Sequence, residues 1–283
     1  MAPLLRVDDW PRLREPVLVV SLSGWVDAGL AGAGAMAVLA EQLGSQREFG
    51  TIDLADLMDL QQTRPVVQLA DGVTRTIQWP SIDFVAGNAG RDVVLCQGPE
   101  PSLRWRAVLG EIADAAVRLG VTSAFTMAGI PSMVSHRHPV QVLCTATDPL
   151  LLEDAGAFRN DYNGPTGAQT ALQVLLGEVG VPTIALWAQV PHYVSSGASP
   201  PAIRAVLDKL RGLAGLSLDL SVLDEQADAY VRRVEEGIAE RPDVAEAVAA
   251  IEAQEAEEQA VSEDDLPSGD ELASEIEKFL RGQ

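Results

Sequence analysis

The stretch at residues 17–43, VLVVSLSGWVDAGLAGAGAMAVLAEQL, decides the fold class of this chain. It is long enough to span a bilayer, but Asp27 would place a costly charge in mid-membrane, and Gly24 and Gly29 interrupt the run. The branched residues at its start favour a strand, and the small residues from Ala28 onward suit a helix that lies tightly on a sheet. We therefore predict a strand, a turn and a buried helix, and no membrane partner.

Further apolar runs rich in branched residues alternate with segments of helical period along the chain. These runs lie at residues 66–69, 93–96, 121–127, 140–145 and 183–190. Such alternation is typical of the α/β class, with a mostly parallel sheet and helices on both faces. Two alternating segments within residues 64–80 flank Asp71 and Gly72, which predicts an inserted β-hairpin.

Several helix starts can be predicted from capping residues. Ser102 is a good N-cap residue for an amphipathic helix that Gly120 would end. Asp148 and Ser199 each precede proline, the residue that is over-represented at the first helical position. We expect helices to begin after all three.

The C-terminal part of the chain has a helical pattern throughout. Residues 218–261 read as a helical hairpin interrupted at Pro242, appended to an α/β body at residues 1–217. Residues 262–283 read as an acidic linker and a short terminal helix. That helix would present an apolar face for a partner, made of Leu272, Ile276, Phe279 and Leu280.

The charge balance limits the partners. The chain has 283 residues, with 20 basic and 41 acidic side chains and a net charge of −21. Residues 221–283 alone hold 19 acidic and 5 basic groups. A field of this sign repels phosphate backbones, so nucleic acid is not an expected partner. Cys96 and Cys144 lie in apolar runs and are expected to be buried and reduced, and no signal peptide is seen, so we expect a cytoplasmic protein.

No motif for a cofactor or metal is evident. The glycine-rich turn has neither a G-x-G-x-x-G spacing nor a Gly-Lys-Ser/Thr. Close packing of the helix on the sheet, with Asp27 as the helix cap, therefore explains the glycines better than phosphate binding does. His136 and His138 could form a metal pair, but His192 is the only other histidine and no C-x-x-C is present. We predict no metal and no cofactor, and interpret the histidine pair as part of a loop that carries Arg137.

Polar residues gather where strands are expected to end and helices to begin. The carboxyl edge of a parallel sheet is the usual place for ligands, although proline, glycine and asparagine also serve turn geometry alone. These positions supply the candidate ligand-binding or partner-binding residues, which are Gly24, Asp27, Gly29, Gln97, Glu100, Tyr162, Asn163, Thr166, His192 and Tyr193.

Four segments in order resemble the proteasome assembly chaperone 2 family in its longer bacterial form. They are residues 24–29 (GWVDAG), 98–101 (GPEP), 162–167 (YNGPTG) and 191–193 (PHY). The resemblance covers about residues 1–215. It implies a three-layer α/β/α fold of the phosphorylase/hydrolase-like kind, self-association with a trimer as the expected state, and binding to proteasome subunits or similar partners. It implies no established reaction. Relatives that dock on proteasomes often carry a penultimate tyrosine, whereas this sequence has Gly282 there.

Two functional hypotheses follow. The first is a non-catalytic binding or assembly protein, whose α/β body self-associates and whose acidic tail engages a partner groove. The alternative is a small-molecule enzyme, a hydrolase or a nucleoside-processing protein, working where the polar segments meet. Only fold analogy motivates the enzyme. A deep pocket that brings Glu100, Tyr162 and His192 within hydrogen-bond reach would favour it.

Overall fold

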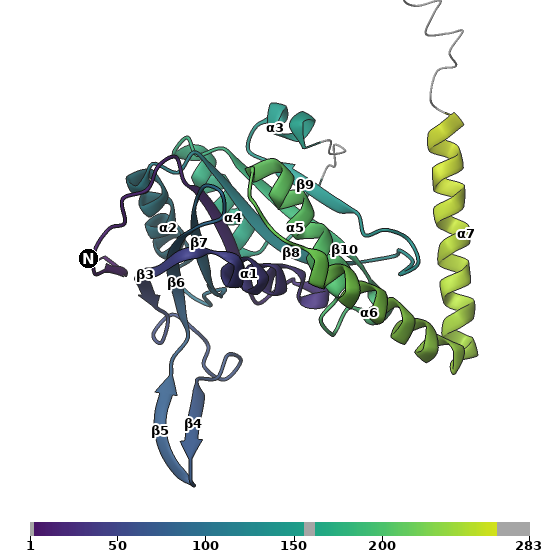
Figure 1. Ribbon diagram of the computed structural model, residues 1–283, viewed down its shortest axis with the longest axis horizontal. Coiled ribbons are helices and arrows are strands. Elements are labelled where there is room, and N and C mark those ends of the chain that lie inside the picture. Colours follow the sequence, from purple (N-terminus) through teal and green to yellow (C-terminus); the bar gives the residue numbers. More distant parts are fainter. Residues whose placement is uncertain (1–2, 156–161, 265–283) are drawn as a thin grey trace, which may run out of the picture.

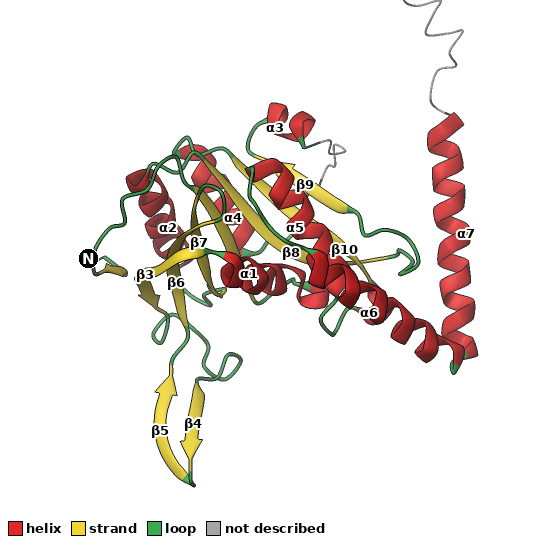
Figure 2. Ribbon diagram, in the orientation of Figure 1, coloured by secondary structure: helices red, strands yellow, loops and turns green. Residues whose placement is uncertain are grey.

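A computed structural model describes residues 3–155 and 162–264 of the chain. Its centre is an eight-stranded sheet in the order β1-β3-β6-β7-β2-β8-β10-β9 (Figures 1 and 2). The strands are β1 (Leu5–Val7), β2 (Val17–Ser23), β3 (Gly44–Asp53), β6 (Ser81–Asn88), β7 (Asp92–Pro99), β8 (Ser123–Ser132), β9 (Val142–Ala146) and β10 (Thr183–Pro191).

The four central strands β7, β2, β8 and β10 are parallel. Antiparallel strands extend both edges, with β6, β3 and β1 beyond β7 and with β9 beyond β10. The predicted α/β class is confirmed, and the parallel part of the sheet is its centre. Strands β3 and β6 were not predicted, because their polar and apolar residues are too mixed to stand out as an apolar run.

Helices cover both faces of the sheet, which gives the expected three layers (Figure 1). The helices α1 (Ala31–Gln42) and α5 (Pro200–Ala214) pack on one face, and α2 (Trp105–Leu119) and α4 (Ala168–Glu178) on the other. Strand β2 is buried on both sides because Val17 and Val19 enter the first core while Leu18 and Val20 enter the second. A continuous apolar run is the signature of such a strand.

The decisive stretch folds as predicted, as strand β2, a turn and the buried helix α1. Small residues let α1 lie directly on the sheet: a Cβ added to Gly32 would be 2.2 Å from the carbonyl oxygen of Met127 in β8. No helix among the described residues is long and apolar enough to cross a membrane. Cys96 and Cys144 are buried and not paired with each other, as expected.

The helix starts were predicted with mixed success. Asp148 caps α3 (Pro149–Asp154) by accepting the N–H of Leu150 at 2.8 Å, as predicted. Ser102 is not the N-cap of α2: Arg104 precedes the helix in the left-handed region, and the Ser102 hydroxyl accepts the N–H of Asp59 instead. Ser199 precedes α5 but makes no side-chain capping bond.

The predicted hairpin is present as β4 (Val66–Ala70) and β5 (Val73–Gln78). Asp71 and Gly72 have φ angles of 54° and 73°, the positive values that a type I′ turn requires. This hairpin forms a sheet of its own and projects from the body (Figure 2).

Two further helices follow the body, α6 (Ser221–Ala239) and α7 (Pro242–Asp264). Helix α6 packs along α5, the chain turns at Pro242 as predicted, and α7 runs beside the body rather than on its sheet (Figure 1). We call α6 and α7 together the arm. The proposed domain boundaries remain predictions, and the predicted partner face of Leu272, Ile276, Phe279 and Leu280 lies outside the described residues.

Candidate functional site

Asp27 binds backbone from two elements. Its carboxylate accepts the N–H groups of Gly32 at 2.8 Å and Ala33 at 2.9 Å, at the start of α1. It also accepts the N–H of Gly129 in β8 at 2.9 Å. Asp27 therefore caps the helix, as predicted, and fastens it to the sheet.

Gly29 joins the same turn to the segment that follows β10. Its N–H donates to the carbonyl of Ser195 at 2.8 Å, and its carbonyl accepts the N–H of Ser199 at 2.8 Å. Its φ of 63° is in the left-handed region, and a Cβ would be 2.7 Å from that of Ser199. Glycine is required here by turn geometry and by close approach.

Glu100 lies on the opposite face of the sheet and is partly buried. Its carboxylate accepts the N–H of Ala168 at 2.8 Å, at the start of α4, and its own N–H donates to the carbonyl of Ser23. Gly24 packs directly against it. Burial raises the pKa of Glu100, and the hydrogen bond from Ala168 opposes that rise. The residue thus serves the start of a helix, where a negative charge is favourable.

The loop at residues 162–167 is largely exposed. Tyr162 is 73% exposed, and its hydroxyl donates to the carbonyl of Pro165 at 2.8 Å. Asn163 and Thr166 are also exposed. Within the described residues, no contact joins Glu100, Tyr162 and His192, so the arrangement that would favour an enzyme is not formed there. A ligand-binding role for these residues remains a prediction.

Gln97 lines a hollow of about 450 Å³ on the α1 face, at the carboxyl ends of β2 and β7. Ser21, Ser23, Met36 and Trp79 also contribute to it. Gln97 and Glu100 are therefore on different faces of the sheet and do not form one site.

A residue that sequence reasoning missed fills the centre of the carboxyl edge. Pairing between β2 and β8 ends at Val20 and Thr126. Beyond that point the buried side chain of Gln169 bridges the strands: it accepts the N–H of Leu22 at 3.3 Å and donates to the carbonyl of Met127 at 3.4 Å. The place where α/β folds commonly bind ligands is here occupied by the protein's own amide.

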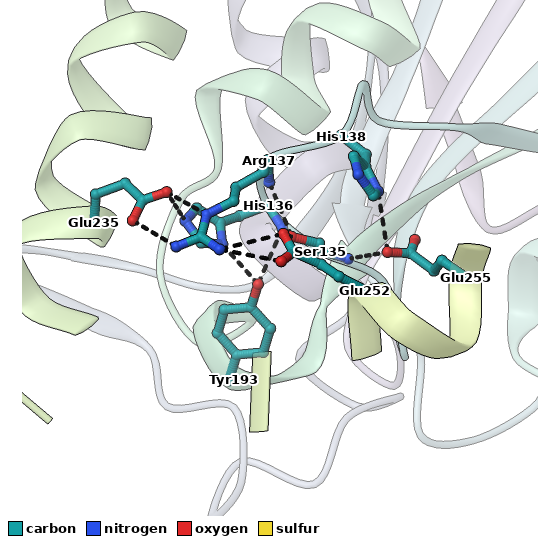
Figure 3. Close-up of polar contacts among 8 residues, drawn as sticks. All are labelled: Ser135, His136, Arg137, His138, Tyr193, Glu235, Glu252 and Glu255. Carbon is teal, nitrogen blue, oxygen red and sulfur yellow. Dashed lines mark hydrogen bonds and ion pairs between the residues drawn. The ribbon is translucent and has the colours of Figure 1, made fainter. Parts of the chain in front are cut away.

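The densest polar cluster joins the body to the arm (Figure 3). We call it the clasp. It consists of the β8–β9 loop residues Ser135, His136, Arg137 and His138, of Tyr193 after β10, and of Glu235 from α6 and Glu252 and Glu255 from α7.

Arg137 is the centre of the clasp. It binds both carboxylate oxygens of Glu235, at 2.6 Å and 2.9 Å, and its Nη1 lies 3.1 Å from Oε2 of Glu252. The hydrogen bond to Glu235 is the main cause that raises the pKa of Arg137 above its ordinary value, and the same bond lowers that of Glu235. One guanidinium therefore holds both helices of the arm.

The remaining members surround Arg137. His138 Nδ1 lies 3.0 Å from Oε2 of Glu255, and the Ser135 hydroxyl donates to Glu252 at 2.9 Å. Tyr193, one of the predicted residues, belongs to this cluster: its hydroxyl lies 2.7 Å from Nδ1 of His136 and accepts that residue's backbone N–H. His192 stacks edge-on against the Tyr193 ring.

His136 is the most buried ionisable group of the clasp, with a side chain only 2% exposed. Its Nε2 lies 3.2 Å from Oε1 of Glu235 but has no well-aligned hydrogen bond. Burial lowers the pKa of His136, and this effect outweighs the opposite influence of Glu235. The imidazole is therefore held in its neutral form more strongly than in the unfolded chain.

This burial predicts a pH dependence. The pKa of His136 is lower in the folded chain than in the unfolded one, so its contribution to stability is present above the ordinary histidine pKa of about 6.5 and is lost as the pH falls. We expect urea unfolding at about pH 7.5, 6.5 and 5.5 to show declining stability. The decline should be smaller in His136→Gln. An equal decline in this variant would contradict the assignment.

A cavity of about 840 Å³ adjoins the clasp, at the ends of β8 and β10. Its lining includes His136, His138, Gln189, Tyr230 and Glu255. The sequence contained one signal for this region, because residues 135–138 (SHRH) bring together an arginine and two of the three histidines of the chain. The carboxylates that bind them are 98 or more positions away along the chain, so no local pattern could identify them.

The sequence matches a protein-family model, and the structure is similar to several solved structures. The PAC2 family model matches residues 21–238. A PAC2 family protein from Streptomyces avermitilis is 36% identical, with a TM-score of 0.74 over 78% of this chain and 95% of that chain. The proteasome-assembly chaperone homologue Rv2125 from Mycobacterium tuberculosis is 34% identical, with a TM-score of 0.76 over 82% and 99%.

The likeness extends to the arm in another structure. Rv2714 from Mycobacterium tuberculosis, a protein of unknown function, is 25% identical, with a TM-score of 0.84 over 93% of this chain and 92% of that chain. No curated protein gives a significant match. The family model covers most of the chain, and the resemblance noted from the four segments is confirmed. This chain belongs to the PAC2 family.

Proposed function

We propose that this chain is a non-catalytic, assembly-chaperone-like protein that binds protein partners, with proteasome subunits as the first candidates. Support comes from its membership of the PAC2 family and from its 34% identity to a proteasome-assembly chaperone homologue. We further propose that it works in the cytoplasm and self-associates, with a trimer as the expected state.

The observation that carries this proposal concerns the carboxyl edge of the sheet. Three polar side chains at this edge, those of Asp27, Glu100 and Gln169, bind the chain's own backbone. Their hydrogen bonds stabilise helix starts and bridge strands. What the molecule exposes is a projecting hairpin and an acidic arm, which are features suited to contacts between proteins.

The proposal is tested with purified components. The full chain is mixed with purified proteasome α and β subunits from the same organism, and complexes are followed by analytical ultracentrifugation. We expect complexes with one subunit type, and faster formation of the assembled particle. An unrelated acidic protein of similar size is the control for charge alone. Absence of both effects at tens of micromolar would contradict the proposal.

The variant Glu100→Gln separates binding from catalysis. The amide that replaces the carboxylate keeps an oxygen that can accept the Ala168 N–H, so we expect the free energy of unfolding to change by less than about 1 kcal/mol. Binding to proteasome subunits should be unchanged, since the carboxylate only serves the start of α4. Loss of function in a variant that remains equally stable would show that the charge itself acts on a ligand.

A further inference from the structure

A row of polar side chains crosses four neighbouring strands near the carboxyl edge of the sheet, on the face that carries α1. The strand register pairs Thr51 in β3 with Asp83 in β6, and Asp83 with Gln97 in β7. It also pairs Gln97 with Ser21 in β2, so all four side chains point to the same face. Leu95, two residues before Gln97, still faces the apolar core on that side. Neighbouring strands lie about 4.8 Å apart, so Asp83, Gln97 and Ser21 can contact one small molecule.

Three residues of this row, Asp83, Gln97 and Ser21, line the hollow of about 450 Å³ described above. Its volume lies within the usual range of small-molecule pockets, about 300 to 1,000 Å³. Ser21 is only 6% exposed, and its hydroxyl makes no hydrogen bond within the part of the chain that the structure describes. The side-chain amide of Gln97 has no hydrogen-bond partner there either. Buried polar groups are almost always hydrogen-bonded, so Ser21 in particular indicates that a molecule from outside the chain meets it here.

The hollow also contains one negative and one positive side chain, those of Asp83 and Arg64. Asp83 is held in place, because its Oδ1 accepts the Thr51 hydroxyl at 2.7 Å and its Oδ2 accepts the Ser81 hydroxyl at 3.0 Å. Each carboxylate oxygen can accept a second hydrogen bond. Arg64, at the base of the β4–β5 hairpin, is exposed and forms no ion pair with any described residue. Within the described residues, neither charge is therefore paired with an opposite one.

We propose that this hollow binds a free α-amino acid with an apolar or aromatic side chain. A zwitterion fits the charges, because its ammonium can donate to Asp83 while Arg64 binds its carboxylate. An anion without an ammonium would be repelled by Asp83 and by the net charge of −21. The side chain of the amino acid packs against Met36 and Trp79, which form part of the apolar wall. The inference does not depend on the protein partner proposed above and adds a small-molecule ligand to the same chain.

NMR titration of the full chain with phenylalanine, leucine and methionine tests the site. We expect at least one of the three to bind with a Kd below about 1 mM. Two derivatives of the tightest ligand then identify the groups that are recognised. Its amide lacks the carboxylate and its N-acetyl derivative lacks the ammonium, so each should bind about tenfold more weakly or less. If none of the three amino acids binds with a Kd below about 1 mM, the proposal is overturned.

Two variants assign each charge of the ligand to one side chain. Arg64→Gln should weaken binding about tenfold and remove the preference for the amino acid over its amide. Asp83→Asn should weaken binding to a similar extent and remove the preference over the N-acetyl derivative. Arg75→Gln, exposed on β5 and outside the hollow, is the matched control and should leave binding unchanged.

The outcome of these titrations is separate from that of the experiment with proteasome subunits. Circular dichroism shows whether each variant is folded. Because Arg64 is exposed, its variant decides the question even if Asp83→Asn is unfolded. Unchanged binding in either folded variant would overturn the proposal. Binding to proteasome subunits is measured without amino acids, so the failure of one proposal is visible whether or not the other succeeds.

Discussion

Replacing Gly32 with alanine is expected to lower the free energy of unfolding by about 3 kcal/mol, the upper part of the usual range for overpacking. The new Cβ would lie 2.2 Å from the carbonyl oxygen of Met127 and 2.7 Å from its carbon. Both atoms belong to the backbone of β8, so relief requires α1 to move off the sheet. Moving the helix would also strain the hydrogen bonds by which Asp27 holds both elements.

The matched substitution at a glycine with free space around it is expected to change the free energy of unfolding in the opposite direction. Gly110 lies within α2, where an added Cβ meets no atom within 4 Å. Alanine is the better helix former by about 1 kcal/mol, so Gly110→Ala should raise stability by up to that amount. Urea unfolding of both variants measures the difference. If Gly32→Ala loses less than about 1 kcal/mol, the contact between α1 and β8 is looser than described.

The predictions that succeeded rest on local signals. The small residues of α1 indicated close packing, Asp71 and Gly72 indicated the turn, and Asp27 caps a helix that begins only a few residues later. In each case the physical cause and the structural effect lie within one short segment of sequence. The central strands stood out for a similar reason, because burial on both faces demands an uninterrupted apolar run.

The features that could not be predicted depend on residues far apart in the sequence. Ser102 was a reasonable N-cap, but its hydroxyl is taken by an N–H from Asp59, 43 positions earlier. Glu100 binds Ala168 across 68 positions, and Gln169 bridges strands 42 and 147 positions away. No pattern in a single sequence specifies such partners. The sequence could therefore place these residues near the ends of strands, while their bonding partners could not be predicted.

The clasp is also formed by residues far apart in the sequence. It lies between the β8–β9 loop and the arm, so it can hold the arm on the body. Among the described side chains of α7, only Val248 and Ile251 are buried, which is little apolar contact for a helix of 23 residues. Polar contacts with the β8–β9 loop must supply much of the remaining attachment. Because those contacts are partly exposed, each contributes modestly, and the arm should open more readily than the core unfolds.

Replacing Arg137 with glutamine is accordingly expected to release α7 while the body stays folded. The change removes the ion pairs to Glu235 and Glu252 and leaves the two carboxylates without their shared cation. Allowing for solvent screening, the loss is about 1 to 2 kcal/mol, or a roughly five- to thirtyfold faster amide exchange in α7. Hydrogen exchange measured by mass spectrometry should show this, with β2 unchanged. Arg241→Gln is the control in the same arm, because its pair with Asp243 is long and exposed. Equal protection of α7 in both variants would mean that the clasp does not hold the arm.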